Sequence, residues 1–291
     1  MALEIKTIRC KNCGAQIFYD ASKQVLKCEF CGSEYLPHEE KPLTEELKAD
    51  KILTFKIEES SAIKIFEKWI TRGFWQPKDL AREFRRTGAK GIYIPCWHFS
   101  FSVNTYWYGQ ERREKKGEGK IVGGKREAVT VEEWIPRSGS RTESYSLFVP
   151  ASGGLSMEEV NQLAQFPLEE SAPFSSEYFL GKQGEIPVLS RDSAWEKAKE
   201  EAISDEKSYA ESQVDRLEKF DINFSEPAST LIYVPIWVFG YKYHGKYYRT
   251  VINGRTGEIY GKKPISKLKV ALAILIPAVV VGVVVLLTHL F

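Results

Sequence analysis

This 291-residue sequence has almost no excess of one sign of charge, because 41 Lys and Arg residues stand against 39 Asp and Glu residues. The resulting net charge of +2 argues against nucleic acid as the main partner, since proteins dedicated to nucleic acids are strongly basic. Cysteine is also scarce, and five residues of it cannot make a disulfide-rich scaffold. Charged residues at 27% and aromatic residues at 13% exclude disorder as a description of the whole chain.

Enzyme signatures are missing as well. A GxxxxGK pattern at 119–125 has Arg126 where a phosphate-binding loop needs Ser or Thr, and a charge run precedes it in place of a buried strand. The four histidines are scattered and form no HExxH motif. We therefore expect a protein that is not an enzyme and has no small-molecule substrate.

Only one long apolar run occurs, at the C-terminal end. Residues 270–291 contain no Asp, Glu, Lys or Arg, and such a helix would reach roughly 33 Å against a hydrocarbon core of about 30 Å. The pattern predicts one transmembrane helix over 266–291. Lysines before the run place the N-terminal domains in the cytoplasm, as a single-pass protein of the cell membrane. These flanking residues are Lys262, Lys263, Lys267 and Lys269.

Four of the five cysteines form two CxxCG motifs separated by 14 residues. This spacing is typical of a zinc ribbon, in which four thiolates enclose a structural Zn²⁺ ion. Two disulfides would conflict with a cytosolic location, and iron is the minor chemical alternative. We expect a ribbon over 1–36 and a polar linker over 37–50. The expected metal ligands are Cys10, Cys13, Cys28 and Cys31.

The rest of the chain contains an IYxPxW repeat. Residues 92–99 match residues 232–239 with five identities in eight positions, and each copy precedes a Tyr-rich alternating segment that indicates strands. Helical periodicity precedes each copy, over 60–72 and 194–219, the second with a capping box at Ser193 and Glu196.

These patterns predict an α+β fold with a duplicated helix-plus-antiparallel-sheet region. We expect units over 51–155 and 156–263, with strands near 221–226, 229–243, 246–253 and 257–260. The repeated Trp and Tyr positions indicate a shared core, and Cys96 indicates a buried apolar thiol.

The order of motifs resembles bacterial TFIIB-type zinc-ribbon proteins, some of which are labelled primosomal or helicase-like. The resemblance rests on the two CxxCG motifs, GIYIPCWHF at 91–99, LFVPAS at 147–152, IYVPIWVF at 232–239 and VINGRTGEIYGKKP at 251–264. It implies a C-terminal membrane anchor. It also implies protein partners of the flotillin-like or phage-shock scaffold kind, with a role in envelope stress or membrane-domain organisation.

A basic segment at 111–126 holds seven Lys and Arg against three Glu. We weigh a solvated hairpin tip against contact with anionic lipid headgroups through Arg112, Arg113, Lys115 and Lys116. Two functions stay open: a membrane-anchored cytosolic adaptor that recruits proteins, or a membrane-tethered nucleic-acid-binding protein. The adaptor is favoured, because residues 1–36 carry only five basic against four acidic side chains, a weak field for phosphate.

Overall fold

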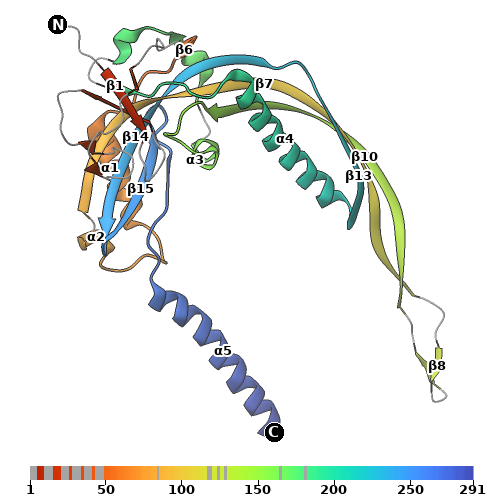
Figure 1. Ribbon diagram of the computed structural model, residues 1–291. Coiled ribbons are helices and arrows are strands. Elements are labelled where there is room, and N and C mark those ends of the chain that lie inside the picture. Colours follow the sequence, from red (N-terminus) through yellow and green to blue (C-terminus); the bar gives the residue numbers. More distant parts are fainter. Residues whose placement is uncertain are drawn as a thin grey trace. The chain divides into compact units, whose positions relative to one another are not determined.

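The computed structural model describes most of the chain from residue 49 onward and short N-terminal strands (Figure 1). The described residues are 5–9, 16–20, 26–27, 34–35, 41–42, 49–83, 85–116, 120–122, 125–127, 130–163, 166–179 and 182–290. They divide into two compact units, neither of which is continuous in sequence. Unit 1 comprises 1–96, 150–188 and 232–291, and unit 2 comprises 97–149 and 189–231.

The main sheet follows the order β10-β7-β14-β15-β16, with the shorter strands β6, β11, β12 and β13 paired beside this path. Its strands are β6 (Lys51–Ile52), β7 (Arg85–Lys116), β10 (Thr130–Pro150), β11 (Ala172–Pro173), β12 (Gln183–Gly184), β13 (Arg216–Phe224), β14 (Ala228–Tyr243), β15 (Lys246–Asn253) and β16 (Ile259–Gly261). Smaller sheets join β1 (Ile5–Arg9), β2 (Gln16–Asp20) and β5 (Lys41–Pro42), then β3 (Leu26–Lys27) with β4 (Glu34–Tyr35), and β8 (Lys120–Val122) with β9 (Lys125–Glu127).

The helices are α1 (Glu59–Thr71), α2 (Leu80–Glu83), α3 (Met157–Gln162), α4 (Arg191–Gln213) and α5 (Lys267–Leu290), with 3₁₀ turns at Leu168–Glu170 and Ser176–Phe179. Helix α1 lies close to the predicted 60–72. Helix α4 ends well before the predicted residue 219, and β13 begins at Arg216. The N-cap of α4 is Ser190, whose hydroxyl accepts from Ser193 N at 3.2 Å, so the predicted capping box at Ser193 is wrong.

The core of unit 1 forms where α1 packs on β14. Phe66 stacks on Phe239 with ring centroids 4.9 Å apart, and Ala62 and Ile70 are buried on the same face of the helix. These positions follow helical spacing, which is why the amphipathic pattern located the helix correctly. Strands β14 and β15 are joined by a tight turn in which His244 and Gly245 both have positive φ, as the His-Gly pair predicted.

The IYxPxW copies lie in β7 and β14, and their shared residues make comparable hydrogen bonds. The indole nitrogen of Trp97 donates to Leu189 O at 2.9 Å, and that of Trp237 donates to Ile57 O at 2.8 Å. The carbonyls of Pro95 and Pro235 each accept a backbone N–H from outside their own strand. The prediction that the repeat builds the core is confirmed for Tyr93, Tyr233 and Trp237, all buried. Cys96 is also buried, and burial raises the pKa of its thiol.

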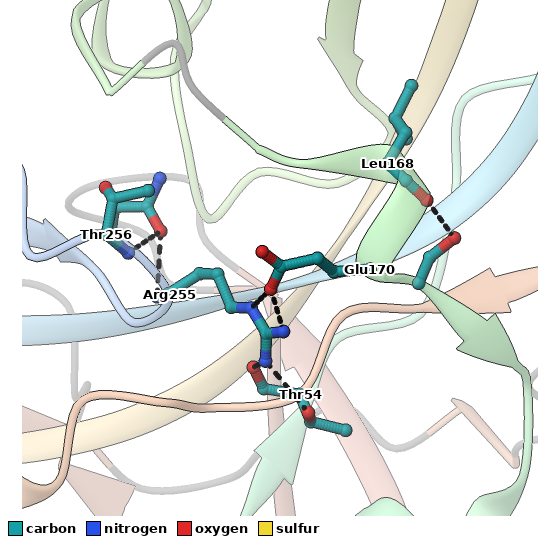
Figure 2. A network of polar contacts seen from close by, with 7 residues as sticks. Thr54, Leu168, Glu170, Arg255 and Thr256 are labelled. Atoms are coloured by element: carbon teal, nitrogen blue, oxygen red, sulfur yellow. Dashed lines mark hydrogen bonds and ion pairs between the residues drawn. The ribbon is translucent and has the colours of Figure 1, made fainter.

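A polar network fastens the turn between β15 and β16 to two distant segments (Figure 2). The guanidinium of Arg255 contacts Glu170 Oε2, with Nε 2.7 Å away, and its Nη1 donates to Thr54 O at 3.3 Å. Asn253 Oδ1 accepts from the backbone N of Arg255 and of Thr256, which holds the turn that presents the guanidinium. The network therefore ties together three stretches of unit 1 that are far apart in sequence.

The expected fold class needs correction. The predicted duplicated antiparallel units are replaced by a mixed, sheet-rich α+β fold, in which β12 pairs with β7 and β6 pairs with β14 in parallel. Side-chain alternation cannot distinguish parallel from antiparallel neighbours, which is why the sequence pattern misled.

The expected transmembrane helix is also overturned. Within the described residues, none of the helices is long and apolar enough to cross a membrane. Helix α5 begins with Lys267 and Lys269 and contains Pro277, and several of its later side chains lie outside the described residues. The single-pass location at the cell membrane is withdrawn with it.

The zinc ribbon expected as part of the fold is likewise absent from what the structure describes. Among those residues, His, Cys, Asp and Glu side chains form no group of three or more that could bind a metal. The four predicted ligands, Cys10, Cys13, Cys28 and Cys31, lie outside the described residues.

Candidate functional site

Unit 2 is a sheet of β10, β7 and β13 with α4 along one side of it (Figure 1). Odd-numbered residues of β7 face the helix: Phe101 contacts Trp195 of α4 with ring centroids 4.8 Å apart, and Val103 and Thr105 are fully buried. Because successive side chains of a strand point to opposite faces, the even-numbered residues face away from α4.

This second side, which we call the open face, has no helix over it in the described part of unit 2. It consists of Asn104, Tyr106 and Tyr108 of β7, Trp134 and Thr142 of β10, and Lys219, Asp221 and Asn223 of β13. The register sets β13 side chains directly opposite β7 side chains: Lys219 opposes Tyr108, Asp221 opposes Tyr106 and Asn223 opposes Asn104. Thr142 Oγ1 donates to Asn104 Oδ1 at 2.8 Å, which joins the third strand to the same surface.

Three large aromatic side chains on the open face are exposed to solvent, with 55% of Tyr106, 38% of Tyr108 and 42% of Trp134 accessible. Exposed aromatics on a rigid sheet are a feature of binding surfaces, because a ring offers a large contact area at small cost in side-chain entropy. Both tyrosines belong to the Tyr-rich segment that the sequence predicted to be a strand, which β7 confirms.

Charges on the open face alternate in sign. Lys219 and Asp221 occupy successive outward positions of β13, Arg112 pairs with Glu132 at 3.2 Å, and Gln110 Nε2 donates to Glu218 at 2.6 Å. A mixed pattern of this kind does not provide the concentrated positive field that phosphate backbones require. The surface is therefore better suited to a protein than to a nucleic acid.

The helix-covered side of unit 2 is sealed by a row of small residues. Ala194, Ala198, Ala202 and Ala210 are buried at intervals of four residues, and Glu206 occupies the remaining position of the row. Tyr145 donates its hydroxyl to Glu206 at 2.9 Å, and burial together with this hydrogen bond raises the pKa of Tyr145. A carboxylate with no exposed surface cannot meet a substrate, so Glu206 holds α4 against β10.

Unit 1 contains a second buried carboxylate, Glu185. Its Oε2 accepts from Gly154 N at 2.9 Å, and the Gly154 carbonyl accepts from Arg249. A Cβ on Gly154 would lie 2.4 Å from Glu185 Oε1, so a larger residue here would force the buried carboxyl group to shift. Glu185 is 1% exposed and binds backbone, which makes it a structural support for the 151–154 loop and not an acid–base catalyst.

The structure gives structural roles to residues that the sequence assigned to a membrane. Lys263 Nζ donates to the carbonyls of Trp69 and Arg72 at the end of α1, and burial lowers its pKa. Lys269 Nζ donates to Phe74 O and Gln76 O, each at 2.8 Å. Because the transmembrane helix is withdrawn, Lys262 and Lys267 are no longer assigned to a membrane flank.

The described residues of the basic segment at 111–126 lie in strands β7, β8 and β9. Arg112, Arg113 and Lys115 belong to β7 and face carboxylates: Arg113 lies 3.1 Å from Glu111, and Lys115 lies 4.0 Å from Glu133. Lys116 ends the strand. Contact of these four residues with lipid stays a prediction.

The chain is similar to an uncharacterized protein. That relative is YdjG of Bacillus subtilis (strain 168), which is 26% identical over 320 residues covering 92% of each chain. No family model matches the sequence, and no solved structure matches it. These findings assign no activity to the chain.

Proposed function

We propose that the protein is a non-enzymatic adaptor that binds another protein through the open face of unit 2. The observation that supports this most directly is the exposure of Tyr106, Tyr108 and Trp134 on one rigid three-stranded surface. Tyrosine and tryptophan flanked by Asn, Thr and charged side chains are the composition of binding surfaces whose energy is concentrated in a few aromatic residues. This is the adaptor function predicted from the sequence, without a membrane anchor.

The sheet supports this role mechanically. Val103 and Thr105 alternate with the outward-facing residues and are fully buried on the α4 side, which fixes the backbone that carries the tyrosines. Preorganised side chains lose little conformational entropy when a partner docks, which favours affinity. A flotillin-like or phage-shock scaffold protein is the first partner to test, because the motif order resembles proteins associated with such scaffolds.

Site-specific photo-crosslinking tests the proposal. A photoreactive phenylalanine analogue replaces Tyr106 or Tyr108 in the full chain, and the matched control places it at Lys207, an exposed position of α4. We expect one protein to crosslink from the open face and not from Lys207. Its affinity for the purified chain should fall about tenfold or more in Tyr106→Ala, as at a binding hot spot.

Other outcomes overturn the proposal. Equal crosslinking from Lys207 would show that the open face has no special role. Crosslinks from Tyr106 and Tyr108 to RNA or DNA would favour the nucleic-acid alternative, in which exposed rings stack on bases.

A further inference from the structure

Strand β10 lies at the edge of the main sheet. In the part of the chain that the structure describes, β7 is the strand that pairs with it, and no strand follows on its outer side. An edge strand of 21 residues presents a long row of backbone groups to any chain able to pair with it. What such a chain must look like follows from the register of β10.

Side-chain contacts fix how β10 opposes β7. Tyr145 stacks on Phe101, Thr142 bonds Asn104, and the Cβ position of Gly139 lies 2.5 Å from the Trp107 ring, all in one antiparallel register. Carbonyls of even-numbered β7 residues point toward β13, as Ser225 N to Ser102 O and Asp215 N to Gln110 O show.

Along an antiparallel strand, the backbone groups of successive residues point alternately to the two neighbouring strands. Since even-numbered residues of β7 bond to β13, the odd-numbered ones bond to β10, where odd-numbered residues oppose them in this register. Even-numbered residues of β10 therefore direct their N–H and C=O groups to the outer edge. Pro136 is one of them, and the N–H that it lacks would have pointed outward, where no β7 bond is lost.

We infer that a second copy of this chain adds to this edge, with β10 pairing antiparallel to β10 of the other copy around Ser140. This register brings Arg137 of each copy opposite Glu143 of the other, and Ser138 opposite Thr142. Moving the centre by one residue brings Arg137 opposite Arg141, or Arg141 opposite its own copy, which like-charge repulsion disfavours.

The ion pairs already present within each copy would continue across the β10–β10 pairing. Arg141 already contacts Glu143 at 2.6 Å, and Arg137 contacts Glu111 at 2.7 Å. Pairing around Ser140 would place Glu143 of one copy beside Arg137 of the other, giving a row of alternating charges across the new ladder. The two-fold axis would stand perpendicular to the sheet, so both open faces would point to the same side and could engage a repetitive partner with avidity.

The test uses the full chain at a series of concentrations in analytical ultracentrifugation. We expect a monomer–dimer equilibrium that weakens roughly tenfold in Arg137→Glu and in Glu143→Arg, and recovers in the double variant with the charges exchanged. Arg113→Glu is the matched control, because it also removes an ion pair with Glu111 but lies in β7. A chain that stays monomeric, or a charge exchange that fails to restore the dimer, overturns the inference.

Disulfide trapping checks the register independently. Opposed residues of a hydrogen-bonded antiparallel pair have Cα atoms about 5.5 Å apart, within the range that a disulfide spans. Ser140→Cys should form a covalent dimer on mild oxidation, at a yield well above those of the parent chain and of Ser208→Cys in α4. A higher yield from Thr142→Cys than from Ser140→Cys would refute the proposed centre.

Discussion

Gly154→Ala probes the buried contact between the 151–154 loop and Glu185. The added methyl group would lie 2.4 to 2.6 Å from the three carboxyl atoms of Glu185, far inside van der Waals distance. Glu185 cannot swing away into solvent, because it is 1% exposed and its Oε2 holds the Gly154 N–H. We expect the free energy of unfolding to fall by about 2–3 kcal/mol, in the range of overpacked cores.

A double-mutant cycle separates this clash from a general loss of stability. Glu185→Ala alone should cost about 1–3 kcal/mol, because it leaves the buried Gly154 N–H without its acceptor. In the double variant the carboxyl group is absent, so the methyl group has room. The free energy of unfolding lost in the double variant should therefore be at least about 1 kcal/mol smaller than the sum of the two single losses. Urea denaturation of the four proteins measures the coupling, and strict additivity would refute the steric argument.

Two further predictions concern alkaline pH and metal content. Burial, and secondly the charge of Glu185, raise the pKa of Tyr233, whose hydroxyl donates to Glu185 O at 2.9 Å. The unfolded state releases this proton near pH 10 while the folded state keeps it, so stability should fall as pH rises above about 10, by up to roughly 1.4 kcal/mol per pH unit. Tyr233→Phe should flatten that slope in pH-dependent urea titrations, and an unchanged slope would contradict the assignment. Metal analysis of the purified full chain should find one Zn²⁺ ion per chain, lost in Cys13→Ser; a chain that contains neither zinc nor iron would end the zinc-ribbon prediction.

Segments with a clear periodicity were predictable from the sequence, because local signals are enough to set their conformation. Helix α1 and the β14–β15 hairpin follow from apolar spacing and from a His-Gly turn pair, both local signals. The end of α4 was misjudged because Tyr209 and Leu217 happen to continue the helical spacing. In the structure Val214 is already extended, and Leu217 pairs with Gly109 in the sheet.

The open face was missed for a different reason. Tyr106 and Tyr108 alternate correctly for a strand, but alternation alone does not say which side of a sheet is covered. That choice depends on α4, whose Trp195 packs against the odd-numbered Phe99 and Phe101. The tyrosines that follow the second copy of the repeat, Tyr241 and Tyr243, have the same local pattern and are buried. Only tertiary packing distinguishes the two sets.

The interleaving of the two units has a consequence for how the chain can be made and cut. The polypeptide passes from one unit to the other between residues 96 and 97, 149 and 150, 188 and 189, and 231 and 232. On the ribosome, unit 2 cannot fold completely before residue 231 has emerged. Unit 1 also needs β14 to β16, which end at Gly261, so the two units become complete within about 30 residues of each other. Any single cut between residues 97 and 231 therefore separates partners within both units at once. The two fragments should therefore fold only together, as a complemented pair. A deletion of unit 2 would have to remove both 97–149 and 189–231.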